Sequence, residues 1–134
     1  MQVKIDTKEK FHVITPNAPV LSATMTDKMD AALLPFLQKD VKNVILDLQE
    51  VEEMDAAAAA KLLQIQQIFY ENNASFVTCH VQKTVNAFLA ENELDDLLNI
   101  TPTESEAWDI VQMEEIEREL LDTEDIEFPD TDIT

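Results

Sequence analysis

Residues 43–63, NVILDLQEVEEMDAAAAAKLL, decide the fold of this chain. The run from Val44 to Leu48 is almost continuously apolar and starts with β-branched residues, which is typical of a strand covered on both faces. Asp55 stands directly before Ala56–Ala60, a series of good helix formers, and its carboxylate can accept hydrogen bonds from the free N–H groups of a first helical turn. The stretch predicts a buried strand, a polar turn and a helix. Strand-to-helix corners of this kind often carry function in α/β folds.

On either side of this corner, the apolar pattern alternates between short strands and helices. Strands are predicted over residues 3–5, 11–14, 20–21, 43–48 and 75–81, and from residue 100. Helices are predicted over residues 26–39, 56–71 and 82–90, and from residue 103. The first of these contains Pro35, which predicts either a kink or a later start near Leu34, and the last is opened by a capping box of Thr103 and Glu106. This order predicts one α/β domain with a mixed sheet of four to five strands and helices packed on one side.

The composition is strongly acidic, with 28 Asp and Glu against 9 Lys and Arg and a net charge of -19. Nucleic acid and anionic membrane surfaces bind through clustered Lys and Arg, so we expect neither as a partner.

The absence of glycine excludes a glycine-rich phosphate loop of the usual form. Cys79 is the single cysteine, so no internal disulfide is expected. No apolar signal core and no apolar window of about 18 residues is found, which predicts a cytoplasmic protein without membrane insertion.

The strand end and the helix start of this corner resemble the STAS domain, the family of bacterial anti-sigma-factor antagonists, stressosome subunits and transporter tails. The family pattern is an apolar strand that ends in Asp-Leu, a few turn residues, and Asp-Ser-Ser-Gly at the start of a helix. Asp47 and Leu48 match the strand end, and Asp55 matches the aspartate before the helix. The resemblance covers about residues 3–112.

The resemblance also implies a role for the residues that depart from the pattern. Ala56 occupies the position of the serine that a partner kinase phosphorylates in switching members, and having no hydroxyl it cannot be phosphorylated. The implied function is a non-catalytic regulator, fixed in its binding-competent state. Its implied partner is an anti-sigma factor or a histidine-kinase-like serine kinase. The implied partner-binding residues are Ser22, Thr24, Met54, Asp55, Ala56, Ala57, Ala58 and Lys61.

A structural role is the alternative that the same resemblance implies. The chain would then be a subunit of a larger assembly, such as a stressosome-like scaffold, or an accessory partner of a transporter ATPase. A regulator is expected to be a monomer or dimer that exchanges partners, whereas a scaffold forms large particles. The sequence leaves the oligomeric state open, a homo-oligomer included.

The sequence predicts no enzyme, no cofactor and no metal site. Carboxylates gather in the turn at residues 50–55, but no histidine joins them and turn carboxylates are usually solvated. Cys79 and His80 are adjacent on a predicted strand, where successive side chains point to opposite faces. They are therefore not expected to form a catalytic pair, and Cys79 is interpreted as a core residue.

The C-terminal segment is predicted to be an acidic extension, residues 113–134, added to a STAS-like domain of residues 1–112. Three apolar residues continue a helical stripe into this extension: Met113, Ile116 and Leu120. One interpretation is that the helix docks on its own domain, and the other is that it binds a partner or a second copy. The residues after Leu121 combine high charge with few aliphatic side chains, which predicts disorder.

Overall fold

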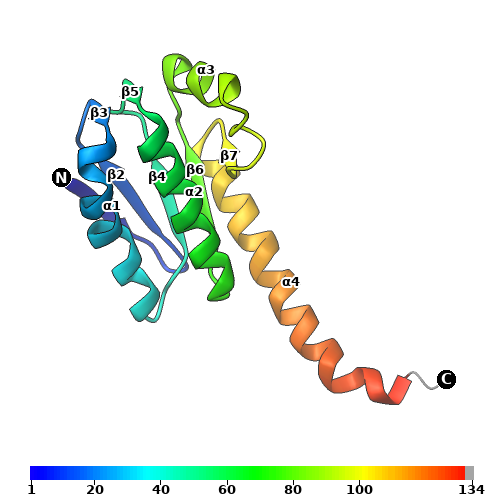
Figure 1. Ribbon diagram of the computed structural model, residues 1–134. Coiled ribbons are helices and arrows are strands. Elements are labelled where there is room, and N and C mark those ends of the chain that lie inside the picture. Colours follow the sequence, from blue (N-terminus) through cyan, green and yellow to red (C-terminus); the bar gives the residue numbers. More distant parts are fainter. Residues whose placement is uncertain (132–134) are drawn as a thin grey trace.

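A five-stranded sheet forms the centre of the molecule, in the order β1-β2-β4-β6-β7 (Figure 1). The computed structural model describes the backbone of residues 1–131 and the side chains of residues 1–121. The strands of this sheet are β1 (Val3–Thr7), β2 (His12–Pro16), β4 (Val44–Asp47), β6 (Phe76–Cys79) and β7 (Ile100–Thr101). β1 is antiparallel to β2, and the other neighbours are parallel. The predicted α/β class with a mixed sheet is therefore confirmed.

Three helices cover one face of this sheet: α1 (Thr26–Leu33), α2 (Ala56–Glu71) and α3 (Lys83–Glu91). Successive side chains of a strand lie on opposite faces, so alternate strand residues reach these helices. The strand residues that pack beneath them are Ile14, Val44, Leu46 and Phe76. The ring of Phe69 on α2 meets that of Phe76, with centroids 5.0 Å apart. α2 begins and ends where the alanine run and its apolar period predict.

The first helix is shorter than its apolar pattern predicts. α1 ends at Leu33, and a 3₁₀ helix, Leu34–Gln38, continues the chain with Pro35 in its first turn. Proline has no N–H group and its ring clashes with the preceding turn of an α-helix, so α-helical hydrogen bonding stops before it. The kink predicted at Pro35 is thus a change of helix type.

The last helix, α4 (Glu104–Thr131), covers the opposite face of the sheet. Ala107 and Val111, one turn apart on α4, are buried in a second core cluster that contains Ile45 of β4. Beside them, Trp108 stacks on Phe11 with ring centroids 4.7 Å apart. The helices α1, α2 and α3 lie on one side as predicted, and the C-terminal helix adds a cover on the other side. Because the central strands are apolar on both faces, the second face needs a cover of its own, and α4 provides it.

A polar network fastens α4 to the chain just before β6. The Glu114 carboxylate accepts hydrogen bonds from the Tyr70 hydroxyl at 2.7 Å and from the Ser75 hydroxyl at 2.6 Å. Arg118, one turn further along α4, donates to the Ser75 hydroxyl oxygen at 3.1 Å. The contacts of α4 with the sheet domain therefore extend to Arg118, past the domain boundary predicted at residue 112.

We expect the hydroxyl of Tyr70 to titrate well above its ordinary pKa of 10.0. Burial of the phenol, and next the adjacent Glu114 carboxylate, raise the pKa of Tyr70 because both disfavour a phenolate. The folded protein keeps this proton above pH 10 whereas the unfolded chain loses it, so the free energy of unfolding falls as the pH rises further. Tyr70 is the single tyrosine, and phenolate absorbance therefore measures its titration directly.

The Tyr70→Phe variant is the control for this titration. This variant supplies the absorbance blank, because it has no tyrosine. Above pH 10 its free energy of unfolding should fall less with pH than that of the wild-type protein. A phenolate midpoint near pH 10 in protein that circular dichroism shows to be folded would contradict the buried position of this hydroxyl.

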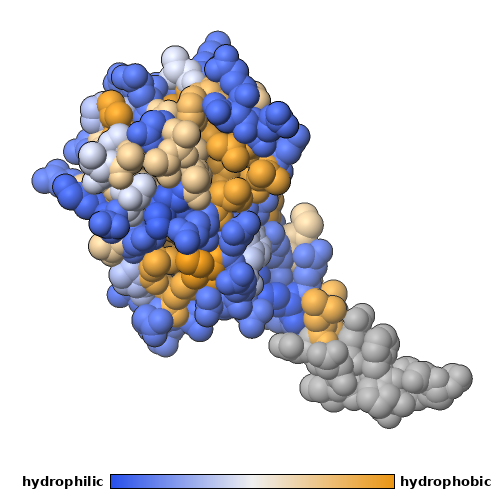
Figure 2. Space-filling view, viewed as in Figure 1, coloured by the Kyte–Doolittle hydropathy of each residue, from blue (hydrophilic) through white to orange (hydrophobic). Residues whose placement is uncertain are grey.

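Several apolar residues between Met113 and Leu121 of α4 face solvent. Four of them are more than half exposed: Met113, Ile116, Leu120 and Leu121. Figure 2 shows apolar side chains on the surface of α4 beside the atoms drawn in grey. At 3.6 residues per turn, Met113 and Leu120 lie across the helix from Val111, the residue that packs on the sheet. The helix therefore docks on its own domain through its other side, as one interpretation predicts, while the exposed stripe leaves binding to a partner or a second copy as a prediction.

α4 is also longer than the sequence predicts. It continues to Thr131, through a segment after Leu121 that is predicted to be disordered. A helix that is already nucleated extends at little cost per residue, which accounts for its continuation past the docked part. Residues 132–134 and the side chains beyond Leu121 lie outside the described part of the chain.

Within that described part, none of the helices combines the length and the hydropathy of a membrane span.

Candidate functional site

The strand-to-helix corner is built from two segments that are far apart in the sequence. β3 (Val20–Leu21) and β5 (Glu53–Met54) pair as short parallel strands directly before the start of α2. The backbone N–H of Asp55 continues this pairing and donates to the Leu21 carbonyl at 3.1 Å. The sequence predicts β3 but not β5, because Val20 and Leu21 form a short apolar run whereas Glu53 and Met54 lie among acidic residues that show no strand pattern.

The Asp55 carboxylate joins these two segments. One of its oxygens accepts from the backbone N–H of Ala58 at 2.9 Å, which confirms the predicted helix cap. The other oxygen accepts from the backbone N–H of Ala23 at 2.8 Å. The Ala58 N–H, and next the Ala23 N–H, hold the pKa of the Asp55 carboxyl below its usual value of 3.8 because they stabilise its charged form. Asp55 therefore fixes the first turn of α2 against the segment before α1.

The structure divides the predicted contact residues of the corner into exposed and buried ones. Ala56 and Ala57 are exposed on the first turn of α2. Met54 and Ala58 are buried in the core, with 6% and 0% of their surfaces exposed, so they do not offer a contact surface as predicted. The cause is local: Met54 pairs with Leu21 in a core-facing register, and Ala58 lies on the side of α2 that faces the sheet.

Lys61 does not supply the free positive charge expected at the rim of the corner. Its ammonium group forms an ion pair with Asp30 of α1 at 2.9 Å and donates to Gln64 at 2.7 Å. Both members of the ion pair are largely covered, so Lys61 connects α1 and α2. The sequence could not show this, because Asp30 is 31 residues away and the pair depends on how the two helices pack.

Ser22 and Thr24 lie beside the corner, as the resemblance implies. They flank Ala23, whose N–H binds Asp55, and their hydroxyl oxygens are 3.0 Å apart. Val20 lies in the same segment and is 41% exposed, and it was not among the predicted contact residues. In a two-residue strand whose Leu21 is buried, the neighbouring side chain must point outward, and this is the signal that could have identified Val20.

The loop between β4 and the corner is held in place by several hydrogen bonds. Gln82 and Thr84, at the start of α3, donate to the carbonyls of Gln49 and Glu52 at 2.7 and 2.8 Å. The backbone N–H of Glu52 donates to the carbonyl of Pro19 at 2.7 Å. The acidic side chains at residues 50, 52 and 53 are exposed around this loop. The corner is thus a pre-formed surface with a small apolar centre and an acidic border.

Comparison with known families identifies the domain that carries this corner. The STAS domain family matches residues 2–107. The chain belongs to the STAS domain family. No match to this sequence was found among curated proteins.

Solved structures share the fold of this STAS domain. A proposed anti-sigma factor antagonist from Thermotoga maritima has a TM-score of 0.71 and 20% identity, with 82% of this chain and 94% of that chain covered. The Bacillus anti-sigma factor antagonist SpoIIAA, in its unphosphorylated form, has a TM-score of 0.66 and 17% identity, with 83% and 96% covered. A sulfate transporter family protein from Wolinella succinogenes has a TM-score of 0.66 and 14% identity, with 81% and 90% covered. At these identities the likeness shows the fold alone.

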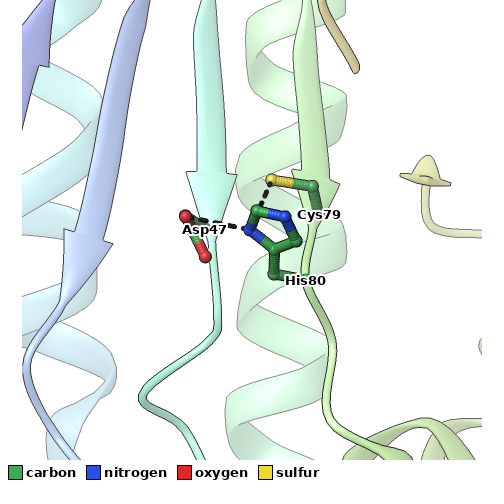
Figure 3. A group of neighbouring side chains, drawn as sticks. All are labelled: Asp47, Cys79 and His80. Carbon is green, nitrogen blue, oxygen red and sulfur yellow. Dashed lines mark hydrogen bonds and ion pairs between the residues drawn. The ribbon is translucent and has the colours of Figure 1, made fainter. Parts of the chain in front are cut away.

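A second group of side chains lies at the same end of the STAS sheet, on the face that α4 covers (Figure 3). Asp47 and Cys79 are direct neighbours on β4 and β6, and both are buried. His80 follows β6, and its Nδ1 lies 3.1 Å from a carboxylate oxygen of Asp47 and 3.9 Å from the sulfur of Cys79. Burial, and next the Asp47 and Glu104 charges, raise the pKa of the Cys79 thiol to about 12.

The prediction that Cys79 and His80 point to opposite faces is wrong. β6 ends at Cys79, and His80 has a left-handed backbone conformation with a φ of 55°. Strand alternation therefore stops at this position, and the imidazole turns to the face that carries Cys79 (Figure 3). The prediction that Cys79 is buried in the core is confirmed.

Proposed function

We propose that this STAS domain is a non-catalytic regulator that binds a protein partner through the corner formed by residues 20–24 and 53–57. The observation that carries the proposal is the double hydrogen bond of Asp55, which presents the Ala56 methyl group at the first residue of α2. In the switching members of the STAS family, the resemblance places the phosphorylated serine at this position. An alanine there presents the uncharged state permanently, so the partner would bind without control by phosphorylation at this residue.

The shape and the charge of the corner support a protein partner. Ala56 and Ala57 are small and exposed, so a partner backbone can approach the start of α2 closely. Glu52 and Glu53 are exposed at its border and would meet basic residues of the partner, which makes binding sensitive to salt. An anti-sigma factor or a histidine-kinase-like serine kinase, in the cytoplasm, is the partner class that the family resemblance favours.

The Ala56→Glu variant tests this proposal. We expect it to reduce partner capture from cells of the source organism by at least about tenfold, because an unpaired charge buried at an interface costs more than about 1.4 kcal/mol. The substitution should leave the domain folded, since a carboxylate is favourable in the first turn of a helix. The measurement is affinity capture at low and high salt, with the bound proteins quantified by mass spectrometry.

Ala31→Glu is the matched control, because Ala31 is an exposed alanine on α1 outside the corner. Capture of the same partner protein should be unchanged in this variant. Equal capture by both variants, or equal loss in both, would show that the corner is not the interface.

A structural role in a larger assembly is the second candidate, and the exposed stripe on α4 favours it. Met113, Ile116 and Leu120 present an apolar surface that an assembly would cover. Light scattering of the purified chain separates the two candidates. A monomer or dimer at all concentrations supports the regulator, whereas large particles support the scaffold.

A further inference from the structure

The side chains of Asp47, Cys79 and His80 converge from the carboxyl ends of β4 and β6, and the proposed function does not use them. One ligand atom of each lies within 4.8 Å of the others, and the three offer a carboxylate oxygen, a sulfur and an imidazole nitrogen. We propose that these residues bind a zinc ion with three protein ligands, and that a water molecule completes the coordination.

Two of the three separations between the ligand atoms are close to those of a tetrahedral zinc site. Zinc binds sulfur at about 2.3 Å and nitrogen or oxygen at about 2.1 Å, which places nitrogen about 3.4 Å from oxygen and about 3.6 Å from sulfur. The His80 nitrogen lies 3.1 Å from the Asp47 oxygen and 3.9 Å from the Cys79 sulfur. These two distances need to change by only a few tenths of an ångström. The Asp47 oxygen lies within 4.8 Å of the Cys79 sulfur, and side-chain rotation would bring this third pair to about 3.6 Å.

The backbone around the three residues holds their side chains in position. Asp47 and Cys79 are paired in the register of two parallel strands, so their side chains leave the same face of the sheet side by side. The backbone N–H of Gln49 donates to the Asp47 carboxylate at 3.0 Å and orients it. His80 holds a left-handed conformation that costs energy for most residues other than glycine, asparagine and aspartate, and this conformation turns its ring toward the other two.

The donor set and the surroundings favour zinc over the hard cations. Magnesium and calcium prefer all-oxygen sites, whereas a thiolate with an imidazole and a carboxylate suits zinc. The His80 side chain is 36% exposed, which leaves a path for the ion and a position for the water. On binding, the thiol proton passes to solvent and the thiolate forms the bond to the metal.

Cobalt(II) titration of the purified, untagged full chain tests the proposal, followed by competition with zinc. Cys79 is the single cysteine, so a thiolate-to-cobalt absorption band in the near ultraviolet must arise from this residue. We expect one cobalt ion per chain, complete displacement by one equivalent of zinc, and no band in the Cys79→Ala variant. The His80→Asn variant keeps a residue that tolerates the left-handed conformation, and should lose at least about tenfold in zinc affinity.

The control is His12→Asn, which removes the other histidine of the chain and leaves the three ligands intact. This variant should keep both the cobalt band and the zinc affinity. No thiolate band in the wild-type protein would overturn the proposal, as would zinc affinity equal in wild type, Cys79→Ala and His80→Asn. Circular dichroism of each metal-free variant shows whether it is folded, so loss of binding is scored on folded protein only.

Discussion

Replacing Val111 with aspartate is expected to lower the free energy of unfolding by about 4 kcal/mol, the largest effect that we expect of a substitution on α4. Val111 is 0% exposed and lies in the cluster between α4 and the sheet. The substitution loses the burial of an apolar side chain, worth about 2 kcal/mol, and places a carboxylate among Ile45 and Val77 without a charged partner. Either α4 detaches at this position or the acid is buried in its neutral form, and both outcomes cost stability.

Met113→Asp is the matched control, because it introduces the same side chain two residues further along the same helix. Met113 is 57% exposed, so its replacement should change the free energy of unfolding by less than about 1 kcal/mol. Urea unfolding at neutral pH, followed by the fluorescence of the single tryptophan, Trp108, measures both variants and reports on α4 itself. Similar losses in the two variants would contradict the orientation of α4.

The elements that the sequence predicts well are those with strong local signals. α2 is predicted over its full length because an aspartate cap, an alanine run and a helical apolar period agree. The face that α4 covers could not be predicted in the same way. Both sides of α4 carry apolar residues: Ala107 and Val111 are buried against the sheet, whereas Met113 and Leu120 are exposed. The sequence therefore does not show which side of the helix packs on the sheet.

The candidate site shows the same division between local and tertiary causes. The Asp55 cap depends on residues three positions apart and is predicted, whereas its bond to Ala23 joins segments 32 residues apart and is not. Lys61 illustrates the point, since its charge is predicted at the surface but its partner Asp30 comes from another helix. The meeting of Cys79 with His80 depends on a single left-handed residue, which no sequence period indicates.

Asn43→Ala is expected to lower the free energy of unfolding by about 3 kcal/mol, although the side chain lies before β4 and not in the apolar core. Asn43 is buried and connects three parts of the chain. Its amide donates to the Lys10 carbonyl at 3.0 Å and to the Glu115 carboxylate at 2.6 Å. Its amide oxygen accepts from the backbone N–H of Ser75 at 2.8 Å. Alanine would leave the Ser75 N–H, which belongs to a fully buried residue, without this partner, and each buried group left unsatisfied costs about 1–3 kcal/mol.

Asn92→Ala is the control for this substitution, because Asn92 is an exposed asparagine whose amide donates to a single carbonyl, that of Phe88. Water replaces this bond at an exposed position, so we expect a loss of less than about 1 kcal/mol. Urea unfolding of both variants, followed by circular dichroism and by Trp108 fluorescence, compares the whole fold with the attachment of α4. If Asn43 joins α4 to the sheet through Glu115, the fluorescence transition of Asn43→Ala should move to lower urea at least as far as the circular dichroism transition. Losses of equal size in the two variants would instead show that the Asn43 network adds no more stability than an exposed hydrogen bond.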